Sequence, residues 1–210
     1  MSNQQQLKGY EYSGSTHGHH HSYLMPTLGK ILNGLKNDRR IFDLGCGNGS
    51  MAAWLDANGW DVAGVDPSEQ GIGQANKAWP HLKLLVGSCY DDLAQKHGKF
   101  PVVISLEVVE HVYAPREYAR CLFNLLEPGG AAVISTPYHG YWKNLALATT
   151  GKMDSHFTAL WDHGHIKFWS VRTLRALLCE AGFSVKEVHR VGRIPILAKS
   201  MILVATKPAK

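Results

Sequence analysis

Residues 107–111, Glu-Val-Val-Glu-His, place two carboxylates and an imidazole in one short stretch of chain. If this stretch forms a helical turn, positions i, i+3 and i+4 bring Glu107, Glu110 and His111 to one face. The valines between them would then point toward a core. Carboxylate oxygens and an imidazole nitrogen are suitable ligands for a divalent metal, and His111 is also a candidate general base. The sequence therefore predicts either half of a metal site or an acid–base site here.

A second pair of histidines, His163 and His165, lies in the segment Trp-Asp-His-Gly-His-Ile-Lys-Phe-Trp-Ser, residues 161–170. Neither a metal-binding repeat nor a catalytic triad surrounds them. Their role depends on what the chain brings near them, so both are candidates for a metal ligand or for a catalytic base.

A third candidate site combines glycines with two acids. The stretch Asp43-Leu-Gly45-Cys46-Gly47-Asn-Gly49 follows a strand-like run, and Asp66 comes about twenty residues later. Glycines permit a tight turn and let the backbone approach a ligand closely. An acid at the end of the second strand can accept hydrogen bonds from ribose hydroxyls. The spacing is not the dinucleotide fingerprint G-x-G-x-x-G. Asp43 would repel the phosphates of NAD but attract an ammonium group, which favours S-adenosylmethionine.

Alternating strand-like and helical patterns must position these groups. The predicted strands are nearly continuous apolar runs, which are typical of parallel strands covered on both faces: 40–45, 61–66, 82–88, 100–106 and 130–136, with two closing strands at 184–191 and 200–206. The predicted helices are 49–58, 68–79, 90–97, 116–127 and 170–181, the last capped by Ser170 and ended by Gly182. Alternating elements predict a doubly wound α/β sheet with right-handed crossovers. Residues 137–169 are expected to be one long irregular segment, too long to be without a role.

The composition fits this class. The chain has 210 residues, 45% apolar residues and a formal net charge of +5, as expected for one domain with a full core. Four cysteines without a C-x-x-C pair predict reduced thiols and a cytoplasmic protein. We expect no signal peptide and no membrane span. We divide the chain into an N-terminal helical lid, residues 1–38, and one domain, residues 39–210, with an acceptor-binding insertion at 137–169.

Four motifs in order, DLGCGNG, GVDPS, SLEVVEHV and LEPGGAAVISTP, resemble those of class I S-adenosylmethionine-dependent methyltransferases. The resemblance covers residues 39 to the end and implies a Rossmann-like seven-stranded sheet, mostly parallel with the last strand antiparallel. It implies that Asp43 and the backbone of Gly45 to Gly49 hold the methionine end of the cofactor, and that Asp66 binds the ribose. The remaining cofactor contacts that it implies are Pro67 at the adenine, Ser88 and Cys89 at the adenine edge, and Leu106 and Glu107 lining the pocket.

Within that superfamily, E-x-x-E-H followed by a later histidine resembles two O-methyltransferase groups, those of ubiquinone biosynthesis and those acting on the 2′-hydroxyl of small RNAs. In the RNA group this motif and a histidine from a segment ending in aromatic residues hold a metal. The pattern H-x-H-x-x-x-W matches His163, His165 and Trp169. The resemblance thus implies a metal site of Glu107, Glu110, His111 and a loop histidine, for which His165 is preferred over His163. Magnesium, manganese, iron and zinc all remain open, and the same motif also occurs in metal-free relatives.

Methyl transfer to a hydroxyl needs a base or a metal to deprotonate the acceptor. O-methylation of a small hydroxylated acceptor, with aromatic molecules included, is therefore the leading hypothesis. The alternatives are a small-RNA 2′-O-methyltransferase and a cofactor-binding subunit without catalysis. We expect no nucleic-acid partner, and a monomer or a homodimer.

Overall fold

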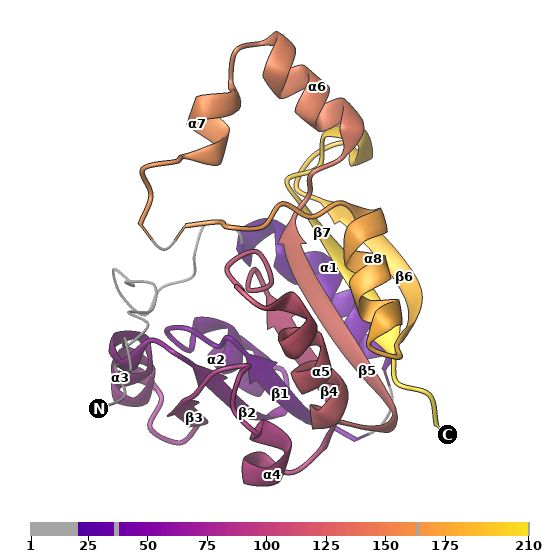
Figure 1. The fold of residues 1–210 in the computed structure, drawn as a ribbon. Helices are drawn as coiled ribbons and strands as arrows, with labels where there is room; N and C mark the ends of the chain where they lie inside the picture. Colours follow the sequence, from indigo (N-terminus) through magenta and orange to yellow (C-terminus); the bar gives the residue numbers. More distant parts are fainter. Residues whose placement is uncertain (1–20, 36–37, 163, 210) are drawn as a thin grey trace, which may run out of the picture.

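The computed structural model describes residues 21–35, 38–162 and 164–209. Within these ranges seven strands form one sheet in the order β3-β2-β1-β4-β5-β7-β6 (Figure 1). Only β7 runs against its neighbours, pairing antiparallel with both β5 and β6. The strands are β1 (Arg40–Leu44), β2 (Asp61–Asp66), β3 (Lys83–Val86), β4 (Phe100–Leu106), β5 (Leu126–Pro137), β6 (Ser184–Val191) and β7 (Ser200–Thr206). This topology confirms the predicted fold class.

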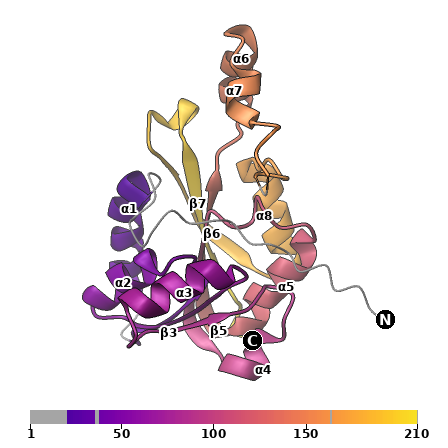
Figure 2. The same cartoon turned by 90° about the vertical axis from the view of Figure 1, so that its left-hand side faces the viewer.

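Helices cover both faces of the sheet. Figure 2 shows α1, α2 and α3 on one side and α4, α5 and α8 on the other. The helices are α1 (His21–Gly34), α2 (Ser50–Ala57), α3 (Glu69–Ala78), α4 (Leu93–His97), α5 (Pro115–Leu125), α6 (Tyr141–Thr149), α7 (Met153–Phe157) and α8 (Val171–Glu180). A short 3-10 helix, η1 (Pro195–Leu197), lies in the connection between β6 and β7.

The apolar strand runs feed two cores because successive strand residues point to opposite faces. In β1, Phe42 and Leu44 belong to the core under α5 and α8, while Ile41 belongs to the core under α1 to α3. Four fully or nearly fully buried side chains of α1 join the second core, namely Leu24, Leu28, Ile31 and Leu32. The helical part of the N-terminal segment is therefore packed on the sheet. Residues 1–20 lie outside the described residues, so the predicted lid stays a prediction.

Several predicted boundaries differ from the structure: β3 ends at Val86 rather than at residue 88, and α4 begins at Leu93 rather than at residue 90. The helix predicted to reach residue 127 ends at Leu125, and β5 begins at Leu126 rather than at residue 130. Leu126 pairs with Phe100 across a register shift, so the Pro-Gly-Gly sequence is accommodated within an irregular strand rather than before it. The start of α8 agrees with the prediction, because Ser170 and Thr173 form a reciprocal capping box.

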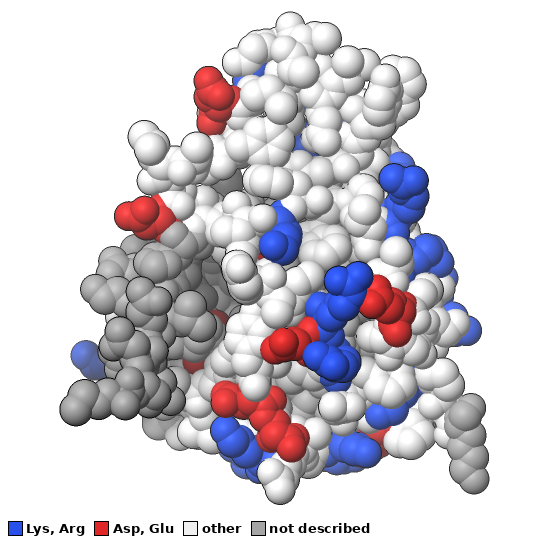
Figure 3. Space-filling view, in the orientation of Figure 1, with Lys and Arg blue, Asp and Glu red and all other residues white. Residues whose placement is uncertain are grey.

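The segment 137–169 was expected to be irregular, and this is wrong. It contains α6 and α7, which project beyond the sheet as an arm (Figures 1 and 2). Residues 144–148, Asn-Leu-Ala-Leu-Ala, contain strong helix formers. The arm carries few charges on the face in Figure 3, and its exposed apolar side chains include Tyr141, Trp142 and Leu160. No helix in the described ranges has both the length and the apolar character that a membrane crossing requires.

Candidate cofactor and metal site

The carboxyl ends of β1, β2 and β4 meet at one edge of the sheet. β1 lies at the centre, between β2 and β4, and the helices that follow β1 and β4 lie on opposite faces. Such a switch in winding direction opens a crevice beyond the strand ends, where α/β proteins bind ligands. A hydrogen bond from Ser105 Oγ to the Leu44 carbonyl, 2.8 Å long, joins the ends of β1 and β4. The predicted cofactor residues and the Glu107–His111 turn therefore belong to the same edge.

The glycine turn after β1 requires glycine for two physical reasons. Gly45 has a φ of 94°, and a Cβ there would lie 2.3 Å from Val108 Cγ2. Gly49 has a φ of 78° at the start of α2, and a Cβ there would lie 2.7 Å from Ala75 Cβ. Any other residue would be strained at this positive φ, and its Cβ would clash with these neighbouring side chains. The contact with Val108 also places the glycine turn directly against the Glu107–His111 turn.

Asp43 and Asp66 are both buried, at 2% and 6% exposure. The Asp66 carboxylate accepts hydrogen bonds from the backbone N–H groups of Gly47, at 2.9 Å, and Ser68, at 2.8 Å. Asp43 Oδ2 has no hydrogen-bond partner in the described part of the chain. Burial, and then the charge of Asp66, raises the pKa of Asp43 to about 7. Burial also raises the pKa of Asp66 in spite of its two backbone donors.

A ligand with a positive charge for Asp43 and hydroxyl donors for Asp66 satisfies these groups. S-adenosylmethionine carries both an ammonium group and a ribose, so the donor set fits it.

The other predicted cofactor residues surround this pair unevenly. Cys46 is 5% exposed and its backbone N–H donates to the Val65 carbonyl, and Leu106 is 9% exposed at the end of β4. Pro67 is exposed after β2, and Ser88 and Cys89 are half-buried after β3. The Ser88 N–H donates to Asp91 Oδ2 at 2.9 Å, so Asp91 fixes the loop that follows β3. No motif in the sequence indicated Asp91.

The Glu107–His111 stretch does not form the regular helical turn that the spacing predicted. Glu107 has a φ of 55°, in the left-handed region that a glutamate rarely adopts. A turn then begins, closed by a hydrogen bond from the His111 N–H to the Val108 carbonyl at 2.9 Å. Glu107 therefore departs from a regular helical turn, and it is not grouped with Glu110 and His111 as a potential ligand.

Glu107 instead joins a network of hydroxyl groups. Its carboxylate accepts hydrogen bonds from Ser135 Oγ at 2.8 Å and Ser200 Oγ at 3.2 Å. Ser200 Oγ is also 3.2 Å from Tyr23 Oη on α1, which links the network to the N-terminal helix. Burial raises the pKa of Glu107 to about 7, although the two serine hydroxyls act in the opposite direction. Ser135 lies within the LEPGGAAVISTP motif, but no sequence pattern indicated that it or Ser200 would contact Glu107, because the pairing of β4, β5 and β7 brings them together. Tyr23 joins the network from α1 through Ser200.

The structure brings three of the four predicted ligands together, namely Glu110, His111 and His165. One potential ligand atom from each lies within 4.8 Å of the others, and His165 Nε2 is 4.0 Å from Glu110 Oε1. Ligands about 2.0–2.2 Å from one ion lie roughly 3–4 Å from one another, so a small inward movement suffices. The structure does not place Glu107 in this group. His163, the other candidate, lies outside the described residues.

The hydrogen bonds of Glu110 and His111 also fit a metal site. Glu110 is 1% exposed, and its Oε2 accepts a hydrogen bond from Thr136 Oγ1 at 2.9 Å, while its Oε1 has no hydrogen-bond partner among the described residues. His111 Nδ1 is 3.1 Å from the Gly164 carbonyl, which can only accept, so Nδ1 donates and the neutral ring has its lone pair on Nε2. A buried carboxylate oxygen without a donor and an imidazole oriented by a carbonyl are both typical of metal ligands.

Backbone contacts hold the segment 164–169 against the turn. The N–H groups of Ile166 and Lys167 both donate to the Glu110 carbonyl at 2.9 Å. Trp169 is 8% exposed, and its Nε1 donates to the Val109 carbonyl at 3.1 Å. These bonds place His165 over Glu110 and His111, and the rings of His165 and His111 are 4.9 Å apart. The H-x-H-x-x-x-W pattern indicated this segment, but only the structure shows that Trp169 anchors it.

The pKa values of His165 and Glu110 are shifted in opposite directions. Burial, then the neighbouring His111 and His156, lowers the pKa of His165 to about 4. Burial, then the charge of Glu107, raises the pKa of Glu110 well above its ordinary value. At neutral pH, His165 is therefore a neutral imidazole, which suits a ligand, and it is too weak a base to favour general-base catalysis.

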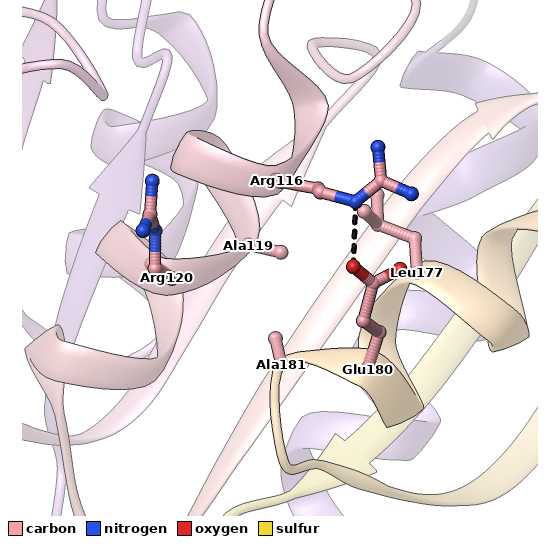
Figure 4. Close-up of a pocket in the computed structure, with 6 residues that line it drawn as sticks. All are labelled: Arg116, Ala119, Arg120, Leu177, Glu180 and Ala181. Carbon is pink, nitrogen blue, oxygen red and sulfur yellow. Dashed lines mark hydrogen bonds and ion pairs between the residues drawn. The ribbon is translucent and has the colours of Figure 1, made fainter.

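A surface pocket between α5 and α8 lies outside this site (Figure 4). An ion pair between Arg116 Nε and Glu180 Oε1, 2.5 Å long, crosses from one helix to the other. Figure 4 labels six lining residues, and none of the predicted site residues is among them.

The sheet order, the glycine turn and the acid at the end of β2 are typical of α/β proteins that bind a nucleoside at a switch point of the sheet. The comparison with protein families narrows this class. The family described as "Methyltransferase domain" matches residues 16–188, and the chain belongs to that family. This confirms the resemblance to methyltransferases seen in the sequence, and it implies S-adenosylmethionine as the cofactor.

Proteins with similar sequences are also methyltransferases by name. The chain is 34% identical over 147 residues to a ubiquinone biosynthesis O-methyltransferase of Caulobacter sp. (strain K31), covering 66% of this chain and 57% of that protein. It is 32% identical over 157 residues to the protein of that name from Azorhizobium caulinodans, covering 71% of this chain and 60% of that protein. The chain thus spans about three fifths of the length of these relatives.

Solved structures support the fold. A protein from Pyrococcus horikoshii has a TM-score of 0.70 at 20% identity, covering 93% of this chain and 94% of that one. An S-adenosylmethionine-dependent methyltransferase from Mesorhizobium loti has a TM-score of 0.64 at 20% identity, covering 85% and 96%.

Proposed function

We propose that the protein is an S-adenosylmethionine-dependent O-methyltransferase that acts on a hydroxyl group of a small aromatic molecule. The observation that carries the proposal is the grouping of Glu110, His111 and His165 beside the glycine turn. The close contact between Gly45 and Val108 connects the two. The relatives named ubiquinone biosynthesis O-methyltransferase support a hydroxyl acceptor.

The reaction is an in-line displacement. The acceptor oxygen forms a bond to the methyl carbon, the bond from that carbon to sulfur breaks, and the hydroxyl proton passes to a base or to water. S-adenosylmethionine supplies the methyl group as a sulfonium when bound. Asp43 would hold its ammonium group and Asp66 its ribose, which fixes the direction of the methyl group. The protein's main task is to align the acceptor oxygen and exclude water.

The second task is to deprotonate the acceptor. We propose that Glu110, His111 and His165 hold a divalent metal, which when bound lowers the pKa of a coordinated hydroxyl. Two imidazoles and one carboxylate suit zinc, iron(II) or manganese better than magnesium, which prefers oxygen ligands. In this proposal Thr136 and the Gly164 carbonyl orient Glu110 and His111 through the hydrogen bonds described above. Glu107 belongs to the cofactor pocket.

The function is tested in two steps. Isothermal titration with S-adenosylmethionine should show one site, and a methyl-transfer assay across matched phenols, catechols and amines should show product only with hydroxylated acceptors. A lack of cofactor binding refutes the proposal, and methylation confined to amines refutes the hydroxyl acceptor. Product only with a short RNA would support the RNA alternative instead.

The metal is tested separately. The His165→Ala variant should lose most of its activity, and a chelator should inactivate the native protein reversibly. His81→Ala is the matched control, because His81 is an exposed histidine paired with Asp56. Full activity after chelation, together with full activity of His165→Ala, rules out the metal site.

A further inference from the structure

Two basic side chains, Lys143 and Arg193, lie at the base of the arm. Lys143, on α6, is buried at 8% exposure although it is a lysine. Its Nζ donates to the Lys199 carbonyl at 3.3 Å, and no carboxylate in the described ranges lies within ion-pair distance of it. One long hydrogen bond leaves most of the donor capacity of an ammonium group unused. Lysine is seldom buried in this way without a partner.

A second cation faces the same place from another element. Arg193 follows β6, and the connection that carries it is closed by a hydrogen bond from the Lys199 N–H to the Val191 carbonyl at 2.9 Å. This connection lies against α6 at the base of the arm (Figure 1). Arg193 is exposed and forms no ion pair with a described residue.

The charge of Arg193 acts on Lys143. Burial, then the positive charge of Arg193, lowers the pKa of Lys143 to about 8, while the charge of Glu107 acts in the opposite direction. The geometry agrees, because the Lys143 ammonium group bonds to the Lys199 carbonyl on the same β6–β7 connection that carries Arg193. Two neighbouring cations, one of them buried, cost free energy that an anion placed between them would recover.

Aromatic rings and neutral histidines form the adjoining wall. The rings of His139 and Phe157 stack with centroids 5.7 Å apart, and Phe168 meets Phe157 edge-on at 4.7 Å. His139 and His156 lie 5.4 Å apart. Burial, then Lys143 and His156, lowers the pKa of His139 to about 4, so its ring is neutral at pH 7. A flat aromatic molecule can pack on such rings.

We propose that Lys143 and Arg193 form an anion-binding subsite of the acceptor pocket, and that the methyl acceptor carries a carboxylate as well as its hydroxyl group. The subsite rests on the proposed function and specifies its substrate as a hydroxylated aromatic acid. The carboxylate is held between Lys143 and Arg193, the ring packs beside His139 and Phe157, and the hydroxyl faces His165. Arg193 and Lys143 come from separate elements, so the arm and the β6–β7 connection select the acceptor together.

The subsite is tested by binding without turnover. Protein saturated with S-adenosylhomocysteine is titrated calorimetrically with 3,4-dihydroxybenzoate and with its neutral counterpart, 3,4-dihydroxybenzamide. The benzoate should bind at least about 10-fold more tightly, which corresponds to about 1.4 kcal/mol. In Lys143→Met and in Arg193→Gln, benzoate affinity should fall at least about 5-fold while benzamide affinity stays within about 2-fold. Lys186→Met, an exposed lysine on β6, is the control and should change neither.

Each other outcome overturns the subsite. Equal affinities for the two probes in the native protein, binding of neither probe, or an equal loss for both in the variants all contradict it. Arg193 is exposed, so Arg193→Gln keeps the test valid if Lys143→Met does not fold. Failure here leaves the proposed function standing whenever neutral catechols are methylated. Conversely, an absence of methylation across the hydroxylated panel refutes the proposed function even if the benzoate binds.

Discussion

Replacing Asp43 with asparagine should stabilise the cofactor-free protein at alkaline pH while weakening its hold on S-adenosylmethionine. Asp43 is 2% exposed, and its Oδ2 has no hydrogen-bond partner in the described part of the chain. Its pKa is about 7 in the folded chain, against an ordinary value of 3.8. A raised pKa means that the folded state binds this proton more tightly than the unfolded state does.

The magnitude follows from linkage. The contribution of Asp43 to the free energy of unfolding is fully present below pH 4 and is lost as the pH rises through 7. At 1.36 kcal/mol for each pH unit, ionisation of Asp43 lowers the free energy of unfolding by about 4 kcal/mol at pH 8. At pH 5 it lowers the free energy of unfolding by only about 2 kcal/mol. Asparagine cannot ionise, so the variant avoids this loss. Its amide leaves a buried donor without a partner, which costs about 1–3 kcal/mol.

The net gain at pH 8 is therefore about 2 kcal/mol. For a chain of this size it corresponds to a rise in Tm of roughly 4–8 °C, with little or no rise at pH 5. Differential scanning calorimetry of the cofactor-free protein at both pH values measures this difference. Isothermal titration should show S-adenosylmethionine binding weakened about 10- to 100-fold, since a charge-assisted hydrogen bond to its ammonium group is lost.

The matched control is Asp61→Asn, an exposed aspartate at the start of β2, which should change neither property. An equal fall in Tm at pH 5 and pH 8 for Asp43→Asn would refute the assignment of a buried, unpartnered carboxylate. Unchanged affinity for S-adenosylmethionine would refute its role at the ammonium group.

Three further predictions concern neighbouring features. Gly45→Ala should lower the free energy of unfolding by about 1–3 kcal/mol in urea titrations, because the new Cβ would lie 2.3 Å from Val108 Cγ2; Gly34→Ala, with open space around it, should have little effect, and equal effects would disprove the steric argument. Ser170→Ala should cost about 1 kcal/mol by removing the cap of α8, and Ser170→Asp should restore most of it; a neutral alanine variant would show that the cap is dispensable. Adding zinc or manganese should raise the Tm of the native protein but not of His165→Ala, and a similar rise in both would place the ion elsewhere.

Much of the fold follows from local sequence patterns. Apolar runs such as residues 61–66 can be strands only if both faces are covered, and helical patterns between them supply the cover. The glycine turn was identifiable because positive φ and close approach leave few alternatives to Gly45 and Gly49. The α8 cap at Ser170 is likewise a local property, because the hydrogen bonds join residues three apart.

The sequence alone did not predict the conformation of Glu107. A regular helical turn would have grouped it with Glu110, but its φ of 55° sends it toward Ser135 and Ser200. Those serines belong to β5 and β7, so the network depends on strand pairing across 28 and 93 residues of chain.

The two histidine-bearing segments became one candidate site only through tertiary structure. Glu110 and His165 are far apart in the chain, and hydrogen bonds from Ile166, Lys167 and Trp169 to the turn backbone bring them within 4.0 Å. A spacing pattern shows which residue types are present, because it depends on local chain geometry. It does not show which segments share a surface, since that depends on long-range packing and on hydrogen bonds between distant residues. The sequence thus determined the sheet, the glycine turn and the candidate ligands, and the tertiary structure decided which of them meet.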